Sequence, residues 1–105
     1  MKDYRRIAED FALHLKAKYG ERIERIILFG SVARGDYRED SDVDLIVVGR
    51  GDRLTLQGEL AAESVRLLLE TGVLVTPMAF TREEIGRVDE TLFGRAVASE
   101  GVVLA

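Results

Sequence analysis

The sequence predicts a small mixed α/β (α+β) domain, with helices packed on one face of a sheet of three or four strands. Two features predict this class. Long helical patterns of apolar residues alternate with short apolar runs typical of strands, and glycines end most of these segments. A chain of 105 residues has the usual length of one domain, so we expect a single domain over residues 1–105.

The expected elements follow one another closely along the chain. Apolar residues recur every three or four positions over residues 3–19 and 54–71, which predicts two long helices ended by Gly20 and Gly72. Pro77 cannot donate a hydrogen bond to a neighbouring strand, so its strand is expected at an edge or exit of the sheet. The remaining segments are strands over 22–29, 42–48 and 73–80, a helical turn over 31–34, a loop over 35–40, a short helix opened by the capping box of Thr81 and Glu84, a helix over 91–100 and a short terminal strand over 102–105.

Composition excludes several classes of protein. The absence of cysteine excludes a disulfide framework and a thiolate metal site. A net charge of −4 argues against binding nucleic acid through overall charge, so no direct DNA binding is expected. Residues 1–6 lack the apolar region of a signal peptide, and no apolar run reaches membrane-spanning length. We therefore expect a cytoplasmic protein with no membrane segment.

Two carboxylates mark the start of the second predicted strand. Asp42 and Asp44 are separated by one residue, so in a strand their side chains project from the same face. Two unpaired carboxylates this close repel each other. A hard divalent cation such as Mg²⁺ offsets that cost, because it takes one or two carboxylates and completes its shell with water and phosphate oxygens. The plainer alternative is a turn with two solvated aspartates. A metal site is favoured because the flanking segments come in a matching order: an apolar strand, Gly-Ser, a loop, the two aspartates and a second apolar strand.

A second motif, Gly30-Ser31, ends the first predicted strand. Glycine lets the backbone approach a ligand closely, and backbone N–H groups with a serine hydroxyl hold phosphate oxygens. One strand thus offers a phosphate site and the next a metal site, which indicates chemistry on a nucleoside triphosphate. Arg34 lies close in sequence to this motif. It either contacts the triphosphate or caps the loop, and both alternatives remain open.

The motif Gly30-Ser31, ten further residues and then Asp42-Val43-Asp44 resembles the signature of the DNA polymerase beta nucleotidyltransferase superfamily. The intervening residues resemble its minimal nucleotidyltransferase (MNT) branch, whose members are often encoded beside a HEPN-domain partner as antitoxin and toxin. The resemblance implies the nucleotidyltransferase fold, with Gly30 and Ser31 on the β- and γ-phosphates and Asp42 and Asp44 as catalytic ligands of Mg²⁺. It also implies transfer of AMP from ATP to a protein or small-molecule hydroxyl.

The chain departs from the family pattern at one position. The family has a third carboxylate on a later strand, and alignment places it near Val73 or Val75, neither of which is acidic. The nearest acids in the sequence are Glu70, Glu83 and Glu84. Three alternatives follow. The enzyme works with two carboxylates on an already activated acceptor, an acid comes from Glu70, Glu83 or a partner chain, or the domain is a degenerate module that binds a partner or nucleotide without turnover.

A chain this small also suits self-association as a homo-oligomer or a complex with a second protein. The sequence shows no interface for either.

Overall fold

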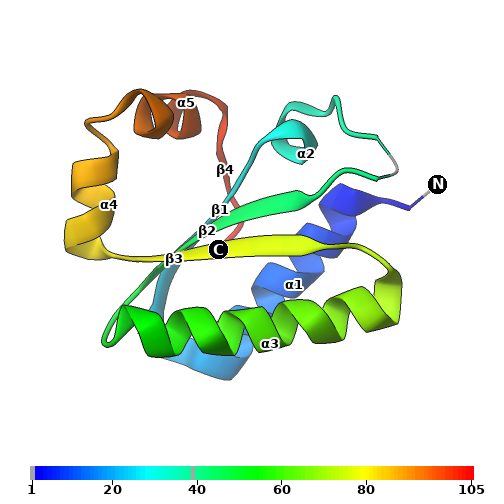
Figure 1. Ribbon diagram of the computed structural model, residues 1–105, viewed down its shortest axis with the longest axis horizontal. Coiled ribbons are helices and arrows are strands. Elements are labelled where there is room, and N and C mark those ends of the chain that lie inside the picture. Colours follow the sequence, from blue (N-terminus) through cyan, green and yellow to red (C-terminus); the bar gives the residue numbers. More distant parts are fainter. Residues whose placement is uncertain (1, 39) are drawn as a thin grey trace.

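The computed structural model describes residues 2–38 and 40–105 (Figure 1). Every predicted helix and strand is present, and each bound that was predicted lies within two residues of the observed one. Glu39, in the predicted loop over 35–40, lies outside the described residues. The elements are α1 (Tyr4–Tyr19), the 3₁₀ turn η1 (Gly20–Arg22), β1 (Ile23–Phe29), α2 (Ser31–Arg34), β2 (Val43–Gly49), α3 (Arg53–Thr71), β3 (Val75–Thr81), α4 (Arg82–Val88), α5 (Leu92–Glu100) and β4 (Val102–Val103).

The strands form one mixed sheet in the order β3-β2-β1-β4. β1 runs antiparallel to both β2 and β4, whereas β2 and β3 are parallel. β3 lies at an edge, as Pro77 predicted. Side chains of α3 cover this edge. The Gln57 side chain donates to the Pro77 carbonyl and accepts from the Ala79 N–H, each at 2.8 Å, and the Ser64 hydroxyl donates to the Val75 carbonyl at 2.9 Å. These bonds satisfy backbone groups that an edge strand otherwise exposes.

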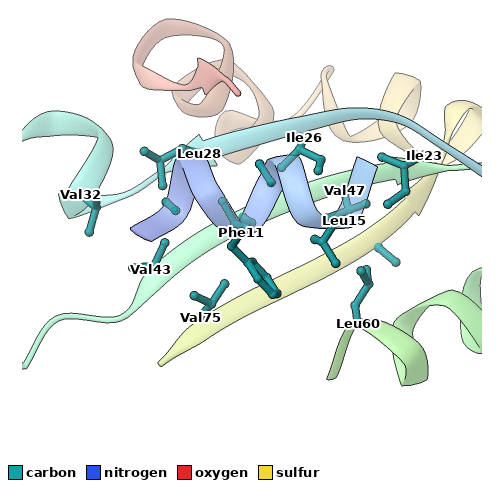
Figure 2. Packing of buried hydrophobic residues seen from close by; sticks show 14 of the residues in the cluster. Phe11, Leu15, Ile23, Ile26, Leu28, Val32, Val43, Val47, Leu60 and Val75 are labelled. Carbon is teal, nitrogen blue, oxygen red and sulfur yellow. The ribbon is translucent and has the colours of Figure 1, made fainter. Parts of the chain in front are cut away.

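Helices cover both faces of the sheet. The prediction of one covered face holds for the long helices, because α1 and α3 pack on the same face (Figure 1). Phe11 and Leu15 of α1 lie there against the strands, beside Val47 and Val75 (Figure 2). The shorter helices α4 and α5 pack on the opposite face, where Ile85 and Val97 join a second apolar cluster. The reason is that β1 and β2 carry nearly continuous apolar runs, so both of their faces need cover.

Antiparallel pairing of β1 and β2 decides where the loops meet. The C-terminal residue of β1, Phe29, pairs with Asp44 near the start of β2. The residues that follow β1 therefore lie beside the residues that open β2. Within the described part of the chain, no helix is long and apolar enough to cross a membrane.

Candidate active site

The β1–β2 register brings the two predicted motifs together. Gly30 directly follows Phe29, which pairs with Asp44. Buried Val43 separates Asp42 from Asp44 and belongs to the core under α1 and α3. The two aspartates consequently face the other side of the sheet, where α4 and α5 lie. The chain thus gathers Gly30, Asp42 and Asp44 at one end of the two central strands.

Gly30 and Asp44 fit together as a single packing unit. Gly30 has φ +78°, a backbone conformation that side chains other than hydrogen disfavour. A Cβ at this position would also lie 2.6 Å from the Oδ2 atom of Asp44. The missing side chain therefore leaves room at this edge of the Asp44 carboxylate. Glycine is required here for two independent reasons, one conformational and one steric.

The loop after Gly30 is held by backbone hydrogen bonds and one buried anchor. Val32 of α2 is buried in the main core. Gly35, with φ +83°, ends α2 and donates its N–H to the carbonyls of Ser31 and Val32. Ser31, half-buried, opens this helical turn and directly follows Gly30. The Gly30-Ser31 backbone is therefore held in place before any ligand arrives.

Arg34 is engaged at its side chain by two carboxylates. Its Nε atom lies 3.3 Å from Asp36 Oδ2, and its Nη1 atom lies 3.3 Å from Oε2 of Glu100 at the end of α5. The hydrogen bond to Asp36 and then that to Glu100 raise the pKa of Arg34. The side chain thus links the loop to α5, which corresponds to the loop alternative. A triphosphate contact would require Arg34 to exchange these partners.

The two aspartates differ in their surroundings. Asp42 is exposed, whereas Asp44 is half-buried. Burial raises the pKa of Asp44, and the nearby charge of Asp42 raises it further. Over residues 2–38 and 40–105, no group of three His, Cys, Asp or Glu side chains gathers into a metal cage. The pair still fits Mg²⁺, which binds proteins through one or two carboxylates and takes its other ligands from water and phosphate.

The structure corrects the expected place of the third carboxylate. Val73 and Val75 are buried in the core under α1 and α3, so both face away from the aspartate pair. The β3 residue that pairs with Asp44 is the exposed Thr76. Thr76 rather than Val75 therefore shares a face with Asp44, because adjacent residues of a strand face opposite sides. The sequence of β3, VTPMAFT, contains no acid at any position.

The three acids considered from the sequence lie elsewhere. Glu83 and Glu84 follow Thr81, five residues along β3 from Thr76, which corresponds to about 16 Å of strand. Glu84 also caps α4 and forms an ion pair with Arg53 at 3.1 Å. Glu70 lines a cleft between α1 and α3, on the opposite face of the sheet from Asp44. None of these acids reaches the aspartate pair in this structure.

An aromatic pair beside the site escaped the sequence analysis. The ring of Phe29 meets the ring of Phe93 of α5 edge-on, with centroids 5.5 Å apart. The only local signal for this pair in the sequence is Phe29, an aromatic residue directly before Gly30-Ser31. Phe93 and Glu100 are more than 60 residues from the motif, so no spacing rule could place them there.

Comparison with known proteins gives a consistent result. Residues 8–99 match the family model described as a nucleotidyltransferase domain. Two proteins of Methanocaldococcus jannaschii, both named "Putative protein adenylyltransferase", are 40% identical over 91% of this chain and 92% of their own, and 34% identical over 72% and 78%. A crystal structure described as a toxin-antitoxin with AMP-PNP superposes with a TM-score of 0.65 at 21% identity, covering 92% of this chain and 72% of that one. The last likeness concerns the fold.

Proposed function

We propose that this chain, which belongs to the nucleotidyltransferase domain family, transfers AMP from ATP to a hydroxyl group of a protein or small molecule. The observation that carries the proposal is the fit of Gly30 against the Asp44 carboxylate, which joins a phosphate-binding motif and a carboxylate pair in one site. The adenylyl group is favoured because the relatives from Methanocaldococcus jannaschii are named adenylyltransferases.

The chain's own residues have separate tasks in this proposal. The Gly30-Ser31 backbone and the Ser31 hydroxyl bind the β- and γ-phosphates of ATP. Asp42 and Asp44 hold Mg²⁺, which when bound neutralises charge that develops on the transferred phosphoryl group and on pyrophosphate. Placement and electrostatics supply most of the catalysis in such reactions. The half-buried position of Asp44 suits this task, because partial burial strengthens its attraction for a cation.

The transfer itself balances without a protein base. The acceptor oxygen forms a bond to the α-phosphorus, while the bond from that phosphorus to the α–β bridging oxygen breaks. Pyrophosphate leaves with the electron pair, and the hydroxyl proton passes to water. Thr76 stands where an acid on β3 would face Asp44, so no β3 side chain takes this proton. Loss of a general base costs about 10²–10⁴ in rate, and we therefore expect slow turnover.

A second candidate function rests on the same lack of an acid in β3. Without such an acid, the domain would bind ATP or a partner protein without turnover. A partner is favoured because the structural neighbour is described as a toxin-antitoxin. We propose a HEPN-domain protein as that partner, either as the acceptor of AMP or as a ligand of a catalytically silent module.

Calorimetric titration of ATP, with and without Mg²⁺, tests the proposal. We expect Mg²⁺-dependent binding that is lost in the double variant Asp42→Asn/Asp44→Asn. The matched control is Asp40→Asn, which removes an exposed aspartate of the same loop and should bind as the wild type does. Absence of Mg²⁺-dependent ATP binding by the wild type would overturn the proposal.

Transfer of label then separates the two candidates. ATP labelled at the α-phosphorus should modify an acceptor protein, whereas ATP labelled at the γ-phosphorus should not. Binding of ATP without label transfer to a co-purified partner would favour the silent module.

A further inference from the structure

We propose that Phe29 and Phe93 form the subsite for the nucleobase of the bound nucleotide, with Phe93 as the ring on which the base stacks. This inference rests on the proposed function and deepens it. The proposed function assigns residues to the phosphates and to Mg²⁺, and this inference assigns residues to the nucleobase.

The position of Phe29 provides the first argument. It pairs with Asp44 across β1 and β2, and side chains of directly opposite residues stand on the same face, about 4.5–5.5 Å apart at Cβ. It also directly precedes Gly30. The Phe29 ring is therefore next to both the carboxylate and the start of the phosphate-binding motif. It is half-buried and packs at the margin of the second apolar cluster.

The exposure of Phe93 provides the second argument. The Phe93 ring contacts Phe29 at an interplanar angle of 87°, yet Phe93 remains 44% exposed. Unlike Phe29, it is not part of the packed margin of the second cluster. A large aromatic ring that rests beside a nucleotide site without being buried has an open surface for a planar ligand. Bases stack on such rings with little regard to sequence, because every base has a π-face.

The third argument is that α5 is fixed firmly enough to present the ring. Thr91 caps the helix by accepting the N–H of Gly94 at 3.0 Å. Gly94 sits against α4 so closely that a Cβ would lie 1.9 Å from the Val88 carbonyl oxygen. Farther along α5, Val97 is buried in the second apolar cluster. The helix that carries the ring is thus anchored at its start and in its middle.

This arrangement also predicts which nucleotides bind. The pair offers aromatic surface and no hydrogen-bonding group, so it reads the area of the base rather than its edge. We expect purine nucleotides to bind more tightly than pyrimidine nucleotides, with little discrimination between ATP and GTP by these two residues.

The test compares ATP with inorganic tripolyphosphate, both titrated in the presence of Mg²⁺. Tripolyphosphate keeps the phosphate contacts and lacks the base. Phe93→Ala should weaken ATP binding by roughly 5- to 100-fold and leave tripolyphosphate binding unchanged. The matched control is Leu92→Ala, which truncates the neighbouring side chain, 83% exposed, and should change neither affinity.

A second variant gives a direct signal from the ring. The chain contains three tyrosines and no tryptophan, so Phe93→Trp introduces a single tryptophan at the proposed subsite, which can be excited at wavelengths where tyrosine hardly absorbs. ATP should quench its emission and tripolyphosphate should not, with ATP affinity equal to or above that of the wild type.

The outcomes distinguish this inference from the proposed function. Equal ATP affinity of the wild type and Phe93→Ala, or an equal loss of affinity for both ligands, would overturn the subsite while leaving the nucleotide site standing. Wild-type protein that binds tripolyphosphate as tightly as ATP would do the same. Failure of the wild type to bind either ligand would overturn both.

Discussion

Each face of the sheet carries a partly or fully buried carboxylate, Glu63 on one face and Asp44 on the other. The two differ in their charged partners and in the direction of their pKa shifts. Glu63, on the face under α1 and α3, is only 3% exposed. Lys18 at 3.0 Å, His14 at 3.3 Å and Arg66 surround it. Burial pushes the pKa of Glu63 upward, but the hydrogen bonds from Lys18 and His14 outweigh it, so the pKa is lowered.

Asp44, on the other face, has no such compensation. Among the residues that the structure describes, no Lys, Arg or His forms an ion pair with it. Burial and then Asp42 raise its pKa. The two carboxylates therefore differ in kind. A structural carboxylate is paired within the protein, whereas a carboxylate left unpaired beside a second one is typical of a binding site.

The largest effect is expected from Gly30→Ala, which alters the surroundings of Asp44 directly. We expect the variant to lose Mg²⁺-dependent ATP binding, because the new Cβ displaces the Asp44 carboxylate. The free energy of unfolding should fall by about 2–4 kcal/mol, from the positive φ together with the steric overlap. Calorimetry and chemical denaturation measure the two effects.

Gly51→Ala is the matched control for this variant. Gly51 also has a positive φ, +84°, but no atom lies within 4 Å of the position that a Cβ would take. It should lose about 1–2 kcal/mol of stability and keep ATP binding. Loss of binding in both variants would show that general destabilisation, rather than the Gly30–Asp44 contact, is responsible.

The next largest effect is expected on the opposite face, in Glu63→Gln. Removing the charge that Lys18 and Arg66 neutralise should lower the free energy of unfolding by about 1–3 kcal/mol at pH 7. Nucleotide binding should be unaffected, because Glu63 lies across the sheet from Asp44. Urea denaturation measures the stability change.

The pH dependence of Glu63→Gln follows from the lowered pKa. An acid with a lowered folded-state pKa contributes stability that is full above its unfolded value, near 4.5, and is lost as pH falls through the folded-state value. The difference between the wild type and the variant should therefore shrink below about pH 4.5. A difference that stayed constant with pH would contradict the ionic role of Glu63.

Asp44→Asn should change the free energy of unfolding in the opposite direction from Glu63→Gln. Because the folded-state pKa of Asp44 is raised, its ionised form destabilises the fold. Without Mg²⁺, the variant should be more stable than the wild type at pH 7. The gain should be only a few tenths of a kcal/mol, roughly, because solvent screens a carboxylate that is only partly buried. The gain should vanish as pH falls through the raised pKa towards the unfolded value of 3.8. Thermal unfolding in a chelating buffer measures it, and a destabilised variant would contradict the comparison.

The smallest effect is expected from Glu100→Gln. The ion pair between Glu100 and Arg34 joins two side chains that are each over 40% exposed. Surface pairs of this kind contribute little, so stability should change by less than about 0.5 kcal/mol. The same variant removes one of the two carboxylate partners of Arg34. Titration of ATP into this variant then tests whether Arg34 contacts the triphosphate. Tighter ATP binding would favour the phosphate alternative over the loop alternative.

Much of the fold was predictable because it depends on local chemistry. The capping box of Thr81 and Glu84 forms as predicted, with both of its hydrogen bonds present. Gly20 and Gly72 end the long helices, and Pro77 lies on an edge strand. Each of these features is decided by a few neighbouring residues, so the sequence alone suffices to find them.

The sequence by itself also determined that Gly30 and Ser31 follow one strand and that the aspartate pair lies at the start of the next, since the order and spacing of these residues are local facts. Only the tertiary structure decided that α4 and α5 cover the second face, that Thr76 rather than Val75 faces Asp44, and that Phe93 and Glu100 border the loop after β1. These outcomes depend on strand register and on contacts between residues far apart in sequence. A shift of one residue in register reverses the face of every side chain. Which residues of two strands lie opposite each other is therefore decided when the strands pair.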